Sequence, residues 1–315
     1  MTPRDHGGGV DGAVSRYGGT RGDWLDLSTG INPAAYPLPA IAPDAWTTLP
    51  DRDAQDALIT AARGFWDVPT GAAILAAPGL STVIARIAGL TSAGRVAIPG
   101  PTYNEYAPAF ARAGWDVDLA TPTPNHDAAV IVHPNNPTGA WRDLPPALPL
   151  CVIDESFCDI APDRSHMQAA LRPGTLILKG IGKFWGLAGL RLGFAIGDPV
   201  LISRLEAMLG PWAVSGPALA IGRAALTDPD WADATRRSLS DAAGRLDMVM
   251  AATGAKLTGG TTLFRLYQVP DAAALQDQLA RHHIWTRVFP WSDTQIRLGI
   301  PGPDGWARLT HAIGG

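Results

Sequence analysis

Between residues 72 and 197 the sequence repeats one pattern, a short apolar run that stops abruptly at glycine, proline or a polar residue. The runs are Ala72–Ala77, Val96–Ile98, Ala128–Val132, Leu150–Ile153, Leu176–Leu178 and Phe194–Ile196. They are continuous rather than alternating, which is typical of strands buried on both faces. Helical periodicity separates several of them, as over Ser81–Leu90 and Tyr106–Ala113. This order predicts an α/β fold built on a mainly parallel sheet.

Polar side chains stand at or just after the ends of these runs. They are Ser81, Tyr103, Asn136, Asp154 and Lys183. Because parallel strands end at the same edge of a sheet, and open α/β sheets bind their ligands there, we expect these residues to gather in one site.

Two changes in composition and hydrophobic pattern divide the chain into three parts. Residues 1–45 are rich in glycine and proline, which predicts an arm with few regular elements. Residues 46–219 contain the repeated apolar runs and form the predicted large domain. Residues 220–315 mix a long helical pattern with strand-like segments, which predicts a smaller α+β domain. We expect the arm to pack with the small domain and the substrate site.

Composition excludes several classes of partner. Lysine and arginine number 25 against 29 aspartate and glutamate, and this formal net charge of −4 argues against nucleic acid or a membrane surface. No apolar run approaches the roughly 18 residues of a membrane span, and the first residues lack the apolar core of a signal peptide. Two cysteines and seven histidines show no spacing typical of metal ligands. We expect a soluble cytoplasmic protein without a metal.

Two segments are suited to binding an anion or a cation. Pro78–Thr82 is a glycine turn leading into a helix, where backbone N–H groups and the helix dipole favour an anion. Asp154 follows an apolar strand, where a carboxylate is costly unless it meets a cation. Taken alone, an ordinary turn and a helix cap explain these segments equally well.

The segment from Lys179 to Gly193 is too apolar and glycine-rich to be a solvated face. Burial favours the neutral amine of a lysine such as Lys183, which is the form that attacks an aldehyde. Arg191, eight positions further on, is suited to bind a phosphate through two parallel hydrogen bonds.

The motifs NNPTG (135–139), IDES (153–156) and GKFWGLAGLRLGF (182–194) occur in an order and spacing that resemble the fold-type I enzymes of aminotransferase class I/II, which use pyridoxal 5'-phosphate (PLP). The resemblance extends from Trp24 to the C-terminus. It implies a mainly parallel seven-stranded sheet with a smaller α+β domain, and a homodimer. It identifies Lys183 as the Schiff-base lysine and Asp154 as the partner of the pyridine nitrogen.

The same resemblance assigns the other cofactor contacts. Asn136 is implied as the donor to the ring hydroxyl and Tyr103 as the aromatic side chain that stacks on the ring. The implied phosphate binders are Leu80, Ser81 and Arg191, with Gly180 where relatives usually have a serine. Arg297 matches the arginine that binds the substrate carboxylate.

The N-terminal segments His6-Gly7-Gly8 and Leu25–Pro33 resemble the threonine-phosphate decarboxylases of cobalamin biosynthesis. This resemblance implies decarboxylation of L-threonine O-3-phosphate to (R)-1-aminopropan-2-yl phosphate. The implied substrate-binding residues are His6, Gly7, Gly8, Ile31, Asn32, Asn136 and Arg297.

Other functions stay open as alternatives. An aminotransferase of the histidinol-phosphate type is the nearest, since it differs only in the bond held for cleavage. The glycines at 7, 9 and 12 match GxGxxG, but no strand pattern precedes them and no helical pattern follows at once. Gly79-Leu80-Ser81 lacks the second glycine of a serine-hydrolase motif, because Val83 stands there. A serine hydrolase and a non-enzymatic regulator are the distant alternatives.

Overall fold

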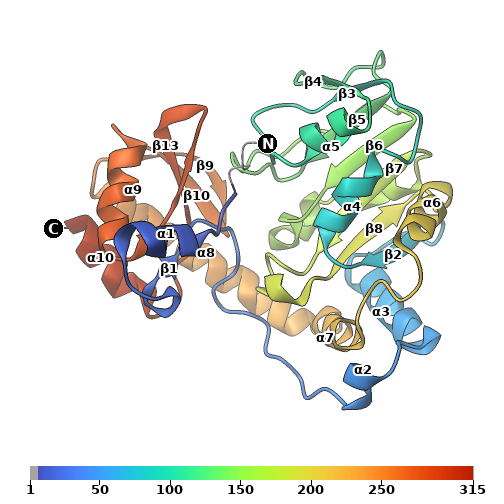
Figure 1. Cartoon of the computed structure of the whole chain (residues 1–315), viewed down its shortest axis with the longest axis horizontal. Coiled ribbons are helices and arrows are strands. Elements are labelled where there is room, and N and C mark those ends of the chain that lie inside the picture. Colours follow the sequence, from blue (N-terminus) through green and yellow to red (C-terminus); the bar gives the residue numbers. More distant parts are fainter. Residues whose placement is uncertain (1–5, 315) are drawn as a thin grey trace. The chain divides into compact units, whose positions relative to one another are not determined.

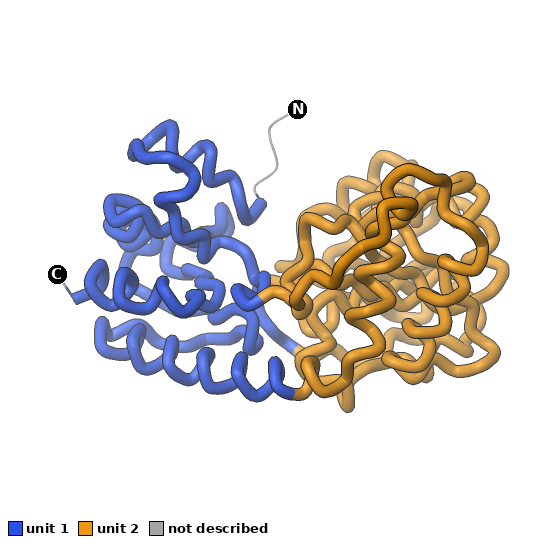
Figure 2. The backbone as a smooth tube through the Cα atoms, turned by 90° about the horizontal axis from the view of Figure 1, so that it is seen from below, with its two compact units in different colours: residues 1–34, 137–140, 234–315 blue, residues 35–136, 141–233 orange. Residues whose placement is uncertain are grey.

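A computed structural model describes residues 6–314 and groups them into two compact units. Unit 1 holds the described residues 6–34, 137–140 and 234–314, and unit 2 holds residues 35–136 and 141–233 (Figure 2). The contacts thus divide the chain at residues 34 and 233, whereas the predicted domains meet at 45 and 219. The difference at 233 arises because one long helix, α8 (Pro229–Ala251), belongs to both units. The predicted domain boundaries stay a prediction.

Unit 2 contains a seven-stranded sheet with the strand order β2-β8-β7-β6-β5-β3-β4 (Figure 1). The strands are β2 (Ala73–Ala77), β3 (Arg95–Ala97), β4 (Asp116–Asp118), β5 (Ala128–Val132), β6 (Leu150–Asp154), β7 (Thr175–Gly180) and β8 (Gly193–Gly197). The pairs from β4 to β7 are parallel, and β8 is antiparallel to both of its neighbours. The predicted α/β fold with a mainly parallel seven-stranded sheet is therefore confirmed. The pattern missed β4, an edge strand whose two aspartates interrupt any apolar run.

The α-helices that lie wholly in unit 2 are α2 (Asp44–Thr47), α3 (Arg52–Phe65), α4 (Leu80–Ile87), α5 (Tyr106–Arg112), α6 (Pro199–Leu209) and α7 (Gly216–Leu226). Apolar side chains of α4, α5 and α6, such as Ile87, Phe110 and Leu205, pack with strand residues such as Val130 and Val152 in one core. This packing holds the strand ends of the sheet in place.

The start of α4 differs by one residue from the helical pattern expected over Ser81–Leu90. The helix begins at Leu80 and its N-cap is Gly79, with no side-chain cap. Gly79 has φ 81°, a conformation that favours glycine, and the helix begins after this turn of the backbone without a capping hydroxyl. Ser81 lies instead in the first turn of the helix.

Unit 1 contains a four-stranded antiparallel sheet with the order β12-β13-β10-β9. Its strands are β9 (Lys256–Thr261), β10 (Phe264–Gln268), β12 (Arg287–Phe289) and β13 (Ser292–Gly299), and its other α-helices are α9 (Ala272–Arg281) and α10 (Gly305–Gly314). Two of the strand-like segments expected within residues 220–315, β9 and β10, form a hairpin, because the chain turns between Thr261 and Phe264.

The arm is more regular than predicted. A helix, α1 (Val10–Tyr17), follows the glycines directly, and β1 (Leu25–Asp26) pairs in parallel with β11 (Ile284–Trp285). Val10, Ala13 and Trp24 form a small apolar cluster with Ala280 of α9. Sequence periodicity did not reveal α1 because only Val10 and Ala13 of its residues are fully buried.

Short 3-10 helices complete the described structure: η1 (Arg21–Asp23), η2 (Cys158–Ile160), η3 (Pro162–Arg164), η4 (Met167–Leu171) and η5 (Ala188–Leu190). Within residues 6–314, no helix combines the length and the apolar character that crossing a bilayer requires.

Candidate active site

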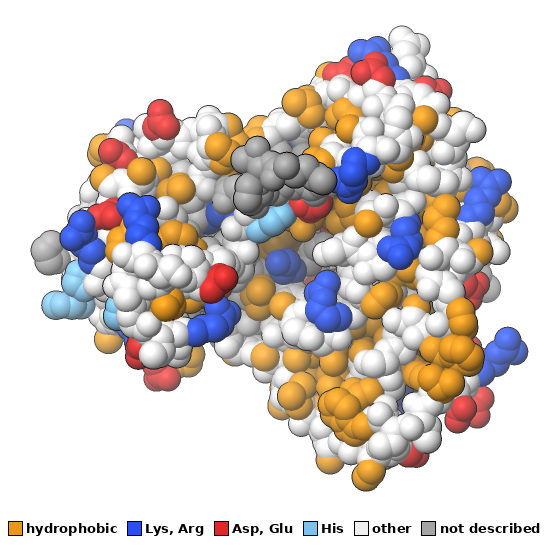
Figure 3. All heavy atoms as spheres, viewed as in Figure 1, with side chains coloured by type: hydrophobic (Ala, Val, Ile, Leu, Met, Phe, Trp, Pro, Cys, Tyr) orange, Lys and Arg blue, Asp and Glu red, His pale blue; other side chains and the backbone are white. Residues whose placement is uncertain are grey.

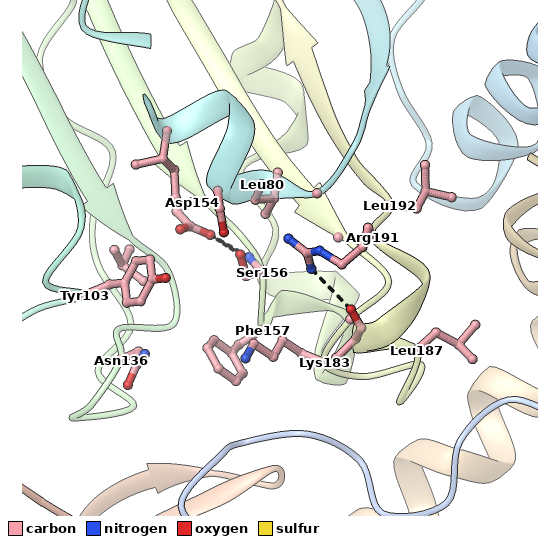
Figure 4. A pocket seen from close by; sticks show the side chains of 17 residues that line it. Leu80, Tyr103, Asn136, Asp154, Ser156, Phe157, Lys183, Leu187, Arg191 and Leu192 are labelled. Atoms are coloured by element: carbon pink, nitrogen blue, oxygen red, sulfur yellow. Dashed lines mark hydrogen bonds between the residues drawn. The ribbon is translucent and has the colours of Figure 1, made fainter. Parts of the chain in front are cut away.

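A pocket opens in unit 2 where β5, β6 and β7 end and α4 begins (Figure 4). All of its lining residues belong to unit 2. They include every residue predicted from the sequence to contact the cofactor, namely Leu80, Ser81, Tyr103, Asn136, Asp154, Gly180, Lys183 and Arg191. The structure therefore brings together in one pocket predicted residues that lie as far apart in the chain as Leu80 and Arg191, 111 positions.

One corner of the pocket is suited to a phosphate. A Cβ added at Gly79 would lie 2.4 Å from Nη2 of Arg191, so only glycine lets the guanidinium lie against the start of α4. Arg191 itself has φ 55°, which a residue with a side chain rarely adopts, and its Nη1 donates to the carbonyl of Ala188 at 3.2 Å. A cationic side chain beside the first N–H groups of a helix favours a bound anion.

A second corner carries the buried carboxylate of Asp154, the last residue of β6, which is only 3% exposed. The phenol of Tyr106 donates to its Oδ2 at 2.7 Å, and the backbone N–H of Ser156 donates to its Oδ1 at 2.9 Å. The Ser156 hydroxyl donates to Oδ1 as well. Because these donors are all neutral, the charge of the carboxylate is stabilised but not cancelled, and it favours a cation in the pocket.

Lys183 lies in the loop between β7 and η5 and supplies the amine of the third corner. Its Nζ lies 5.6 Å from the centre of the Phe157 ring, and Phe184 and Trp185 beside it are fully buried. The loop thus places a half-buried amine in the same pocket as Asp154 and Arg191 (Figure 4).

Lys179, four residues earlier, has a different environment. Its Nζ lies 2.7 Å from the Glu155 carboxylate and 3.4 Å from that of Asp159. Burial acts to lower the pKa of Lys179, but these two carboxylates outweigh it and raise the pKa above its ordinary value. Lys179 therefore stays an ammonium, which cannot attack an aldehyde, and Lys183 is the candidate nucleophile.

A separate group of predicted residues meets within unit 1. The N–H of Gly8 donates to the hydroxyl of Ser28 at 2.7 Å, and Nη2 of Arg297 donates to the carbonyl of Ser28 at 2.7 Å. A Cβ on Gly7 would lie 2.5 Å from that same carbonyl oxygen. We call Gly7, Gly8, Ser28 and Arg297 the Ser28 cluster.

The remaining predicted substrate residues of unit 1 lie in the same arm. Asn32 is buried and its side-chain oxygen accepts from the N–H of Ala34 at 3.0 Å, while Ile31 is half-buried and His6 is exposed. Their roles toward a substrate stay predictions.

Among the described residues, side chains of metal-ligand type meet at His133, Glu155 and Cys158, with ligand atoms within 4.8 Å of one another. The Glu155 carboxylate already pairs with Lys179 and accepts from Ser165 and from the N–H of His166. Burial raises the pKa of the Cys158 thiol, which disfavours the thiolate that a metal needs. These three residues are best explained as part of the buried core, where they have structural contacts.

Comparison with known proteins identifies the family. The model of the family "Aminotransferase class I and II" matches residues 25–313. The chain belongs to this family. It is 42% identical to a threonine-phosphate decarboxylase of Sinorhizobium sp., over 99% of this chain and 98% of that protein. It is 37% identical to a threonine-phosphate decarboxylase of Pseudomonas aeruginosa, over 98% and 97% of the two chains.

Among solved structures, a histidinol-phosphate aminotransferase of Sinorhizobium meliloti in complex with pyridoxal 5'-phosphate superposes with a TM-score of 0.82. It covers 99% of this chain and 96% of its own, but only 18% of the residues are identical, so it supports the fold alone. The predicted family and the predicted fold type are confirmed, and the protein is a PLP-dependent enzyme of this aminotransferase family.

The three corners fit the phosphate, the ring nitrogen and the aldehyde of PLP. The Gly79–Arg191 corner fits the phosphate, because a side chain at position 79 would fill the space that the guanidinium occupies. The Asp154 carboxylate fits a protonated ring nitrogen, and the Lys183 amine fits the aldehyde. The chemistry of these donors therefore agrees with the cofactor of the family.

Two residues of the site escaped the sequence analysis. Tyr106 was expected only as the start of a helix, and Ser156 only as part of a motif, yet both donate to Asp154. For Ser156 there was a local signal, since the backbone N–H two residues after an aspartate often donates to its carboxylate. For Tyr106 there was none, because its contact with Asp154 spans 48 residues.

Proposed function

We propose that this protein is a threonine-phosphate decarboxylase, which converts L-threonine O-3-phosphate to (R)-1-aminopropan-2-yl phosphate. The observation that carries the proposal is its identity of 42% and 37%, along almost the whole chain, to two proteins of that name. The superposed histidinol-phosphate aminotransferase shares the fold but only 18% of the residues. The proposed role belongs to cobalamin biosynthesis.

In this proposal Lys183 holds the cofactor covalently and Asp154 faces its ring nitrogen. Tyr103 stacks on the ring and Asn136 donates to the ring hydroxyl. Arg191, Ser81 and the backbone of Leu80 and Gly180 bind the cofactor phosphate. When bound, PLP withdraws electrons from the bonds at the substrate Cα.

The substrate has an anionic group at each end, and we assign one binding group to each. Arg297, which is 5% exposed and lies in β13, takes the carboxylate. His6 and Gly7 take the phosphate, while Gly8, whose N–H donates to Ser28, fixes the loop that carries them. We also assign Ile31, Asn32 and Asn136 to binding the substrate.

Binding the substrate at both its carboxylate and its phosphate explains how the residues select the bond that breaks. Holding both anionic ends fixes the torsion about Cα, so that binding energy from the remote phosphate orients the reacting bond. The bond between Cα and the carboxylate carbon then breaks, CO2 leaves, and a proton takes its place on Cα.

The deciding experiment is a turnover assay of the purified protein with PLP and L-threonine O-3-phosphate. We expect release of CO2 and formation of the amine phosphate in equal amounts. As a control, the same protein receives histidinol phosphate with 2-oxoglutarate, and we expect no glutamate. Amino transfer in the control without CO2 release in the first assay would contradict the decarboxylase.

We further propose that the enzyme works in the cytoplasm as a homodimer. Hydrophobic side chains gather on unit 2 around α2 (Figure 3), where Leu38, Trp46 and Leu49 are 67%, 68% and 63% exposed. A surface of this kind favours association with a second copy. Light scattering at micromolar concentration should give twice the mass of one chain, and a fully active monomer would contradict the dimer.

A further inference from the structure

The carboxylate of Asp154 has more hydrogen-bond donors than a simple ion pair requires. Tyr106 reaches Oδ2 at 2.7 Å. Ser156 reaches Oδ1 with both its N–H and its hydroxyl (Figure 4). A carboxylate offers about four lone-pair positions. These three donors leave one of them, on Oδ2, for a further partner.

Tyr106 is built into the site with little freedom. Its ring is fully buried in the core formed by the seven-stranded sheet and helices α4, α5 and α6. There it meets the Tyr103 ring edge-on at a centroid distance of 6.2 Å. Burial, and then the negative charge of Asp154 and the hydrogen bond to it, raise the pKa of Tyr106 well above its ordinary value. The phenol therefore stays protonated and donates to Asp154 at any working pH.

The neighbouring acid shows what these donors achieve. Glu155 is equally buried, but its carboxylate turns to the Lys179 ammonium at 2.7 Å, and its charge is cancelled there. Among the residues that the structure describes, Asp154 accepts hydrogen bonds from the neutral groups of Tyr106 and Ser156, so its negative charge remains for the pocket. The titratable and charged side chains that line the pocket with it are Tyr103, Lys183 and Arg191.

We propose that Tyr106 and Ser156 are positioning residues for the cofactor, which hold ionised Asp154 in one orientation with a lone pair of Oδ2 toward the ring nitrogen. The proposal rests on the role of Asp154 in the proposed function. Neither residue touches the reacting atoms; both act through the carboxylate.

The proposal predicts the direction of a spectroscopic shift. Without the phenol, Oδ2 of Asp154 is no longer held toward the ring nitrogen, so the negative charge that favours a proton on that nitrogen acts on it less. The ring then loses its positive charge, which had opposed a proton on the covalent link to Lys183. That link therefore keeps its proton to higher pH.

The experiment is a pH titration of the visible absorbance of the PLP-loaded protein, which reports the proton on the Lys183 link. For Tyr106→Phe we expect the midpoint to rise by about one pH unit, which is about tenfold in proton affinity. Ser156→Ala should shift it in the same direction but less, because the Ser156 N–H still donates to Oδ1. Any turnover should fall in kcat rather than rise in KM.

Tyr267→Phe is the matched control. Tyr267 is also buried, at 1% exposure, its phenol donates to Asp247 at 2.7 Å, and neither residue lines the pocket. The variant Tyr267→Phe should lower the melting temperature about as much as Tyr106→Phe and leave the titration midpoint unchanged.

The outcomes separate this proposal from the proposed function. Shifted midpoints in a protein that releases no CO2 support the positioning role and overturn the proposed substrate. CO2 release with a midpoint in Tyr106→Phe equal to that of the wild type overturns the positioning role alone. Equal shifts in Tyr106→Phe and Tyr267→Phe also overturn it, because a general loss of stability then explains both.

Discussion

The cofactor pocket of unit 2 and the Ser28 cluster of unit 1 are built in different ways. The pocket takes its side chains from the ends of strands such as β5 and β6, whose residues are all buried. The Ser28 cluster takes its glycines and its serine from the arm and only Arg297 from a strand. Strand ends in a packed core hold reacting groups in one geometry, while a loop can change its specificity without refolding the domain. This difference predicts cofactor chemistry in one region and substrate choice in the other.

The largest expected effect is that of Lys183→Ala. Without the amine there is no covalent link, so we expect loss of the borohydride-reducible adduct and at least about a thousandfold loss of turnover. Mass spectrometry of the reduced protein measures the adduct. Lys179 is the internal control, because its paired ammonium should carry no adduct in the wild type. An adduct that persists in Lys183→Ala at another lysine contradicts the assignment.

Asp154→Asn should have the next largest effect. The amide has nearly the same shape but no charge to keep the ring nitrogen protonated, so turnover should fall by about a hundredfold or more while the fold stays intact. Turnover and circular dichroism are the two measurements. Turnover near that of the wild type contradicts the role of this carboxylate.

A pair of glycine variants tests the division between the two regions directly. In Gly79→Ala the new Cβ meets the Arg191 guanidinium, so PLP should bind about tenfold more weakly, with little change in KM for threonine phosphate. In Gly7→Ala it meets the Ser28 carbonyl, so KM should rise by about tenfold while the affinity for PLP is unchanged. Titration with PLP and steady-state kinetics on both variants give the comparison. If both variants change the same constant, the two regions are not separate in function.

The smallest expected effect is that of Ser28→Ala. The change removes the acceptor of the Gly8 N–H and also the hydroxyl that donates to Oδ1 of Asp26 at 2.6 Å, while the Ser28 carbonyl that binds Arg297 remains. Losing the hydrogen bond to Gly8 costs about 0.5–1.5 kcal/mol, so we expect KM to rise about two- to tenfold with kcat nearly unchanged. An unchanged KM for threonine phosphate would show that the Gly8 contact does not shape the substrate site.

The local sequence pattern was sufficient to predict a strand where every side chain of that strand is buried. Ala128–Val132 was predicted residue for residue as β5, because each of its side chains is buried and the run has no interruption. The same logic failed for β4 and α1, whose polar residues face outward at an edge or on an arm. Helix α6 went unpredicted although Asp198 and Pro199 mark its start, since its apolar residues are not confined to one face.

The sequence by itself identified the family and its cofactor, because three of its motifs resemble those of that family, and it singled out residues that line one pocket. Only the tertiary structure decided which lysine lines the pocket and what holds the aspartate. Lys179 and Lys183 stand in similar apolar surroundings along the chain, yet packing places two carboxylates beside the first and the pocket beside the second. Tyr106 meets Asp154 across 48 residues for the same reason: hydrogen bonds between distant elements depend on how the core packs, which no local pattern records.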